Sequence, residues 1–121
     1  MDTKSLGRYG EELAVRFLER KGCWLLERNF KNKLGEIDLI VRDGGVICFV
    51  EVKTRRSLSC GRPQESVHWH KQRKIIRIAL SYLQFKFRSS DVLSRFDIIS
   101  IYQDPAGQDP IEHIVNAFYI S

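Results

Sequence analysis

Three charged residues interrupt otherwise apolar stretches of this sequence: Asp38, Glu51 and Lys53. Side chains alternate between the two faces of a β-strand, so Glu51 and Lys53 are expected on the same face of one strand. The sequence Asp43-Gly44-Gly45 lies between the two stretches and predicts a tight hairpin. Antiparallel pairing around this hairpin would place Asp38 opposite Glu51. The pattern therefore predicts a cluster of two carboxylates and one lysine near the open end of the hairpin.

The chemistry of such a cluster is that of phosphodiester hydrolysis. Two neighbouring carboxylates repel each other, and a cation relieves that repulsion. Mg²⁺ fits, with Mn²⁺ as an alternative, because it accepts one or two carboxylates and fills its remaining positions with water and phosphate oxygens. The metal would activate a water molecule, and Lys53 would orient that water, assist its proton transfer or stabilise the phosphoryl oxygens. A salt bridge at a strand edge is the alternative explanation of Glu51 and Lys53.

A further carboxylate is available from the first predicted helix. Glu11 lies beside the apolar face of that helix, whereas Glu12 points toward solvent by the same spacing. We therefore predict Glu11 as a metal ligand together with Asp38 and Glu51. An ordinary carboxylate near a helix N-terminus, favoured by the helix dipole, is the alternative.

Basic residues are expected to surround this cluster. The chain has 20 Lys+Arg and 15 Asp+Glu and a formal net charge of +5, which favours association with polyanions. Residues directly after the Glu51–Lys53 strand and at the start of the second helix are predicted to contact nucleic-acid phosphates: Arg55, Arg56, Lys71, Gln72 and Lys74. A solvated basic face is the alternative for each of them.

His68-Trp69-His70 also attracts attention as a metal or stacking site. The two histidines are two residues apart, which on a helix directs them to different faces, so a surface or capping role is favoured over a metal pair. For Trp69 a packing role is favoured over a base-stacking platform.

The elements that must position these residues follow from the hydrophobic spacing. Apolar residues at helical spacing predict helices over 6–21 and 66–87, and Gly22 suits the C-terminal cap of the first. Segments rich in β-branched and aromatic residues predict strands over 24–30, 35–42, 46–54, 95–102 and 113–120, with a polar loop over 55–64. The order αβββαββ indicates an α/β fold with one mixed sheet flanked by helices. A length of 121 residues suits a single domain over 1–121.

The cysteines and the apolar runs bear on the compartment. Cys23, Cys48 and Cys60 are far apart and lack the spacing of a zinc or redox motif, and Cys48 is expected to pack as a small hydrophobe. The sequence begins without an apolar signal segment, and no apolar run approaches the roughly 18 residues of a membrane span. A cytoplasmic protein without a membrane segment is expected.

The motifs around the acidic cluster resemble a known signature. Gly35-Glu36-Ile37-Asp38 and Val50-Glu51-Val52-Lys53 are similar to the PD-(D/E)xK nuclease signature, with Ile37 in place of its proline. Together with Gly7-Arg8-Tyr9-Gly10-Glu11-Glu12, Arg28-Asn29-Phe30 and Lys71-Gln72-Arg73-Lys74-Ile75, they look like the YraN-like family of small bacterial proteins.

The resemblance implies a restriction-endonuclease-like fold related to archaeal Holliday junction resolvases. In those resolvases a glutamate of the first helix joins the metal site, and its position corresponds to Glu11. The implied activity is a metal-dependent DNA endonuclease, with branched DNA in repair or recombination as the expected setting. The alternatives are a nuclease-fold protein that binds nucleic acid without efficient cleavage, or one that depends on a protein partner. Junction resolution would require a homodimer, and the sequence leaves the oligomeric state open.

Overall fold

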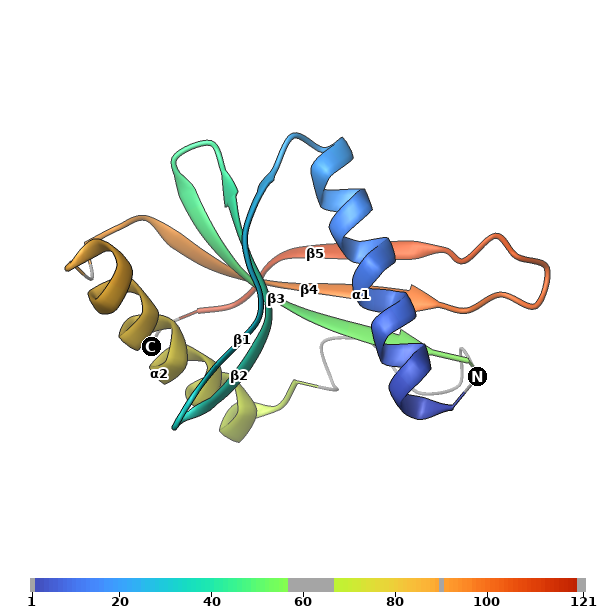
Figure 1. The fold of residues 1–121 in the computed structure, drawn as a ribbon, viewed down its shortest axis with the longest axis horizontal. Coiled ribbons are helices and arrows are strands. Elements are labelled where there is room, and N and C mark those ends of the chain that lie inside the picture. Colours follow the sequence, from blue (N-terminus) through green and yellow to red (C-terminus); the bar gives the residue numbers. More distant parts are fainter. Residues whose placement is uncertain (1, 57–66, 90, 120–121) are drawn as a thin grey trace.

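A five-stranded mixed sheet forms the centre of the fold, and one helix packs on each of its faces (Figure 1). The computed structural model describes residues 2–56, 67–89 and 91–119, so most of the expected loop over 55–64, with Cys60, lies outside the described residues. The elements follow the predicted series: α1 (Thr3–Arg20), β1 (Trp24–Asn32), β2 (Gly35–Asp43), β3 (Val46–Arg55), α2 (Trp69–Phe87), β4 (Ser94–Tyr102) and β5 (Ile111–Phe118).

The strands lie in the order β1-β2-β3-β4-β5, which is also their order along the chain. Neighbouring strands are antiparallel except for β3 and β4, which are parallel. Parallel neighbours require a long crossover connection, and α2 lies within it. The α/β class and the mixed sheet predicted from the sequence are confirmed.

Helix α1 is fixed at both ends by local hydrogen bonds. The Asp2 carboxylate accepts a hydrogen bond from the Ser5 backbone N–H at 2.7 Å, so the helix begins three residues before the predicted position 6. At the other end Gly22 adopts φ +91° and donates to the Glu19 carbonyl, while Cys23 donates to the Leu18 carbonyl. This Schellman arrangement confirms Gly22 as the residue that ends the helix.

The β2–β3 hairpin is the predicted one. Asp43 pairs with Val46 across Gly44 and Gly45, and Gly44 adopts φ +60°, which glycine tolerates without strain. The pairing then runs through Arg42–Ile47 to Leu39–Val50.

Strand β3 is covered on both of its faces, which agrees with its nearly continuous apolar stretch over Val46–Val50. Ile47 and Phe49 belong to the core beneath α2, and Cys48 and Val50 belong to the core beneath α1. Cys48 is buried and packs as a small hydrophobe, and burial raises the pKa of its thiol to about 12. Alternation continues along the strand, so Glu51 and Lys53 fall on the α2 side.

Helix α2 begins at Trp69, later than the predicted position 66, and ends where Arg88 adopts a left-handed backbone with φ 57°. His68 occupies the N-cap position without a side-chain capping hydrogen bond. In the described part of the chain, neither helix is both long and apolar enough to cross a membrane.

Candidate active site

At Asp38 the backbone pairing between β2 and β3 ends, and a hydrogen bond to the Asp38 side chain takes its place. The last backbone pair on this side of the hairpin is Leu39–Val50. One residue further, the Asp38 Oδ2 atom accepts a hydrogen bond from the Val52 backbone N–H at 2.8 Å. The carboxylate of β2 is therefore bonded directly to β3 between Glu51 and Lys53. The prediction that the hairpin brings Asp38 and Glu51 together is confirmed.

Glu51 is a buried carboxylate whose ion-pair partner comes from the second helix. Its exposed fraction is 5%, and its Oε2 atom lies 3.1 Å from the Lys71 Nζ atom. Lys71 was predicted as a phosphate contact, and the structure brings it into the acidic cluster instead of leaving it at the periphery. The α2 helix thus supplies a cation to a cluster that the hairpin assembles.

The protonation of the acidic pair is shifted by its surroundings. Burial raises the pKa of Glu51 to about 7, and the charge of Asp38 adds to this effect against the opposing charge of Lys71. Burial also raises the pKa of Asp38, while the hydrogen bond from Val52 lowers it. Both shifts have the sign expected for carboxylates that are desolvated and close to like charge. The pair carries negative charge at a free-energy cost that a cation would reduce.

The two lysines of the cluster are shifted in opposite directions. Burial lowers the pKa of Lys53, and a hydrogen bond with Lys71 and the charge of Lys71 lower it further. Burial also opposes charge on Lys71, but its hydrogen bond to Lys53 and the attraction of Glu51 raise its pKa overall. Lys71 therefore holds its proton while Lys53 gives its proton up more readily than an ordinary lysine.

Glu11 approaches this cluster from the other face of the sheet. Its carboxylate receives a hydrogen bond from Asn29 and lies 4.0 Å from the Arg28 Nε atom, and burial followed by the charge of Asp38 raises its pKa. Across the described residues, no three His, Cys, Asp or Glu side chains are gathered as a metal-binding group. Glu11 is thus within the electrostatic reach of Asp38, and its role as a third ligand stays a prediction.

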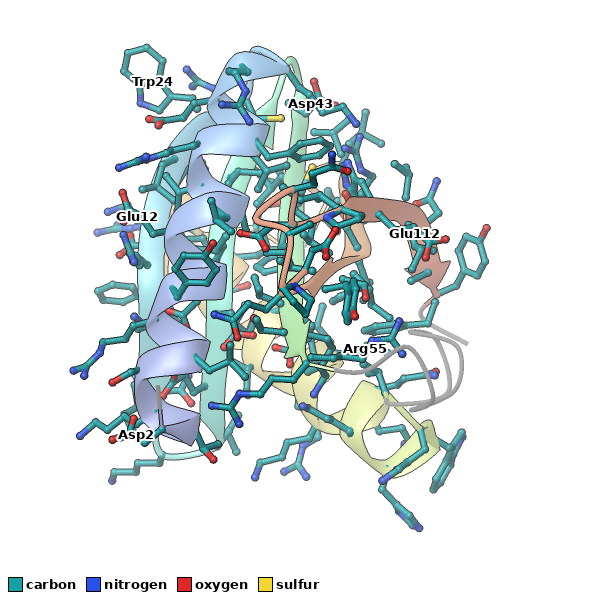
Figure 2. The ribbon with its side chains drawn as sticks, turned by 90° about the vertical axis from the view of Figure 1, so that its right-hand side faces the viewer. Asp2, Glu12, Trp24, Asp43, Arg55 and Glu112 are labelled. Atoms are coloured by element: carbon teal, nitrogen blue, oxygen red, sulfur yellow. The ribbon has the colours of Figure 1, made fainter. Side chains whose placement is uncertain are left out.

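The position of Glu11 depends on an unusually close approach of α1 to β3. A Cβ atom added at Gly10 would lie 1.7 Å from the Thr54 Oγ1 atom, so only glycine fits there. Glu12, one residue further, pairs with Arg28 at 2.8 Å and lies on the outer side of α1 (Figure 2). The prediction that Glu12 points away from the cluster is confirmed.

Asn29 is a site residue that sequence reasoning missed. The flanking pairs Arg28–Leu39 and Phe30–Ile37 put Asn29 opposite Asp38 in the β1–β2 register. Its backbone is left-handed, with φ 55°, a conformation that asparagine tolerates better than most residues. This local kink accompanies the Asn29 hydrogen bond to Glu11. An asparagine inside a strand sequence was the available signal.

The other predicted phosphate contacts occupy different places. Lys74 packs over Gly35 at the start of β2. The approach is so close that a Cβ atom added at Gly35 would lie 2.8 Å from the Lys74 Cε atom. Gln72 donates from Nε2 to the Val67 carbonyl at 2.7 Å, which fixes the segment before α2 rather than the acidic cluster. Arg55 lines a hollow beside β4 and β5, and Arg56 is exposed just beyond β3. Their contacts with phosphates stay predictions.

The segment His68-Trp69-His70 lies on the surface. Both histidines are exposed, in line with the surface role favoured for them. The packing role favoured for Trp69 is wrong, because 59% of this side chain is exposed. Its position in the first turn of α2 directs the ring outward, and helical spacing alone could not show which face the sheet covers.

The fold and the site together define an α/β protein in which the partly buried Asp38 and the buried Glu51 lie beside two lysines. A family model described as "Uncharacterised protein family UPF0102" matches residues 10–101, and the chain belongs to this family. It is 52% identical over 122 residues to a UPF0102 protein of Geobacter metallireducens, covering 100% of this chain and 98% of that protein. It is 48% identical over 120 residues to one of Geotalea uraniireducens, covering 99% and 94% respectively. Both relatives are bacterial, as the resemblance implied.

Proposed function

We propose that this protein is a metal-dependent endonuclease of the restriction-endonuclease-like, YraN-like type, which hydrolyses phosphodiester bonds in DNA. The observation that carries the proposal is the proximity of Asp38 to the buried Glu51, next to one lysine whose pKa is lowered and one whose pKa is raised. A purely structural ion pair would be served by one carboxylate and one lysine. Two carboxylates and two lysines, brought together by the β2–β3 hairpin and α2, support chemistry on an anion.

The donor set fits a magnesium ion better than a metal that needs a complete protein cage. Asp38 and Glu51 would hold the ion, and Mg²⁺ characteristically uses one or two carboxylates and completes its shell with water and substrate phosphates. The raised pKa values of both carboxylates fit this assignment, because a divalent cation would stabilise their charged forms. When bound, the ion would supply Lewis-acid polarisation of the phosphodiester and acidification of a water molecule.

The lysines of the chain would divide the remaining work. Lys53, whose pKa is lowered, can accept a proton at Nζ from the attacking water. Lys71 retains its charge, pairs with Glu51 and can stabilise negative charge on the phosphoryl oxygens. The Val52 N–H keeps the Asp38 carboxylate in one orientation.

Branched DNA in repair or recombination is the substrate setting that the resemblance favours, and a homodimer would be needed to cut both strands of a junction. Cleavage of a panel containing four-way junction, flap, single-stranded and duplex DNA tests the activity, with Mg²⁺, Mn²⁺ or EDTA. Asp38→Asn, Glu51→Gln and Lys53→Met are expected to lose cutting. Glu19→Gln and Lys86→Met, both exposed and remote from the cluster, are matched controls for the loss of a carboxylate and of a lysine.

A second readout is independent of cleavage. Mg²⁺ should raise the melting temperature of the wild-type protein and of Glu19→Gln, but not that of Glu51→Gln, because binding to the folded state alone stabilises it. Cutting that survives Asp38→Asn would exclude the site. DNA binding without cutting, in a protein that Mg²⁺ still stabilises, would favour a binding or partner-dependent protein over the enzyme.

A further inference from the structure

The outer face of α2 carries a hollow that the proposed chemistry does not use. It has a volume of about 210 Å³ and lies between the helix and the residue that follows β5. Two aromatic rings border it, Trp69 and Tyr119, whose exposed fractions are 59% and 69%. The other lining side chains are apolar or cationic, apart from the amide of Gln72: Arg73, Ile76, Arg77 and Leu80.

The aromatic ring of Trp69 is held in place by its neighbours. The Arg73 guanidinium carbon lies 5.0 Å from the centre of the Trp69 ring, within the range of a cation–π contact. The His70 ring packs edge-on, with its centre 4.9 Å from that of Trp69. An exposed tryptophan that is already oriented by an arginine offers a flat surface for a flat ligand. Bases of single-stranded nucleic acid stack on such surfaces.

Two further hollows adjoin the first around α2 and share side chains with it or with each other. A second hollow of about 330 Å³ shares Trp69, Arg73 and Arg77 with the first and adds His70 and Lys74. A third, of about 340 Å³, shares His70 and Lys74 with the second and includes Glu36 and Lys71, whose ammonium contacts Glu51. The three hollows follow one another around α2, from the side of Tyr119 to the side on which Lys71 contacts Glu51.

The cations that line these hollows indicate which kind of ligand the hollows bind. Arg73, Lys74 and Arg77 are exposed, and within the described part of the chain no salt bridge joins them to a carboxylate. A polyanion with flat apolar rings matches both the cations and the aromatic border. Bases within a duplex are already stacked and paired, so an unpaired segment is required.

We propose that the hollow between Trp69 and Tyr119 binds an unpaired base of a nucleic-acid strand whose backbone passes around the outer surface of α2 toward the Asp38–Glu51 cluster. This inference deepens the proposed function and rests on it, since it names the substrate as one with a single-stranded segment beside the cleaved bond. Arg73, Arg77 and Lys74 contact the phosphates along that segment, and Trp69 supplies the stacking surface.

Binding measured in EDTA separates this inference from catalysis. Fluorescence anisotropy would follow a labelled short oligothymidylate, an abasic oligonucleotide of the same length and a blunt duplex. Trp69→Ala should weaken binding of the oligothymidylate about tenfold, the scale of one lost base–aromatic stack, and leave the abasic oligonucleotide within about twofold. Trp69→Phe should restore most of the affinity. Trp24→Ala is the matched control, because Trp24 is similarly exposed, at 67%, but lies at the start of β1, at the top of Figure 2, and lines none of these hollows.

The possible outcomes are distinct. An unchanged oligothymidylate affinity in Trp69→Ala, or an equal loss for the abasic ligand, would overturn the stacking site. Wild-type affinities that are equal for the two oligonucleotides would leave only a polyanion surface and would also overturn it. Base-dependent binding through Trp69 in a protein that cuts nothing would support the stacking site while the endonuclease proposal fails. DNA cleavage by a protein whose oligonucleotide binding does not depend on Trp69 would support the endonuclease proposal and overturn the stacking site.

Discussion

At the scale of single residues, the charged forms of Asp38 and Glu51 lower the stability of the folded protein. Glu51 is buried beside Asp38, and both carboxylates have raised pKa values. Folding therefore disfavours their charged forms, in contrast to a carboxylate held in a simple salt bridge. Such a site is common where a group must bind a cation or react. The cost should be visible as a dependence of stability on pH.

Glu51→Gln should make the folded protein more stable above neutral pH. A carboxylate whose pKa rises from 4.5 unfolded to about 7 folded contributes stability below the unfolded value and loses it as the pH rises through the folded value. The glutamine is neutral throughout. In urea unfolding with EDTA, the variant should therefore exceed wild type at about pH 8 by on the order of 2 kcal/mol, and the two should converge near about pH 4.

The exposed Glu19 provides the control for this change. Glu19→Gln removes the same charge from the solvent-facing side of α1 and should leave the difference in unfolding free energy small at both pH values. An advantage of Glu51→Gln that is equal at both pH values would mean that packing rather than charge is responsible.

At the scale of elements, α1 is set against β3 by one close contact. Gly10 leaves room for the Thr54 side chain, and Gly7, three residues earlier on the same helix, has nothing within 4 Å of its missing Cβ. This contact sets the distance between α1 and the sheet, and therefore the position of Glu11. Because Gly7 and Gly10 lie in the same helix, comparing alanine at the two positions separates the effect of this contact from the effect of helix propensity.

Gly10→Ala should destabilise the protein, and Gly7→Ala should stabilise it. Alanine gains roughly 0.5–1 kcal/mol over glycine inside a helix when space allows, which applies to Gly7. At Gly10 the added methyl meets Thr54, and overpacking typically costs about 1–3 kcal/mol. Thermal and urea unfolding of both variants measure this. Equal gains in stability for both would show that α1 can move away from β3 freely.

A second set of contacts ties β4 to its neighbours around Asp97, a residue that sequence reasoning placed in a strand without a role. Its fully buried carboxylate accepts hydrogen bonds from Arg95 at 3.1 Å and from the Asn116 backbone N–H at 3.1 Å, and contacts His113 Nε2 at 2.8 Å. Burial favours the neutral acid, but these donors together lower the pKa of Asp97. The network joins β4 to β5, and Arg95 extends it to Asp43 of β2.

Asp97→Asn should be strongly destabilising, by roughly 3–5 kcal/mol, because it removes one partner of a buried charged network. Since the pKa of Asp97 is lowered on folding, its contribution is present above the unfolded value of 3.8 and is lost as the pH falls through the folded value. The variant and wild type should therefore approach each other in strong acid. Asp91→Asn, at an exposed position, is the control in a urea-unfolding series.

At the scale of the whole molecule, only some of the basic residues are placed to contact a nucleic acid at the candidate site. The net charge is +5, and the cations that line the adjoining hollows belong to α2, whose Lys71 contacts Glu51. Other basic residues, such as Arg42, belong to the β2–β3 hairpin, whose Asp43 lies at the top of Figure 2, well away from Arg55. Binding of a polyanion should therefore respond to α2 and not to the hairpin.

The salt dependence of binding measures this distribution. Lys74→Ala and Arg77→Ala should each make the slope of log affinity against log salt shallower by about 0.7 for single-stranded DNA, since each removes one phosphate contact. Arg42→Ala should leave the slope unchanged. The measurement is made in EDTA so that cleavage does not interfere. A slope altered equally by all three variants would indicate non-specific association with the net charge.

Much of the fold and half of the site were readable from sequence because they depend on local patterns. The alternation around Glu51 and Lys53 and the turn chemistry of Asp43-Gly44-Gly45 predicted the hairpin and the proximity of Asp38 and Glu51. Gly22 predicted the end of α1 because a glycine just after a helical pattern is typical of a C-terminal cap. Strand periodicity, helix caps and tight turns are each set by residues a few positions apart.

Tertiary structure alone decided how the two helices meet this hairpin. The ion pair of Lys71 with Glu51, the exposure of Trp69 and the hydrogen bond from Asn29 to Glu11 each join residues from different elements. The same holds for His113 and Asp97. A helical pattern states that one face is apolar, but it does not state which strand that face covers or how closely. Those choices depend on the crossover between β3 and β4 and on side-chain packing across the sheet, and neither is encoded in local spacing.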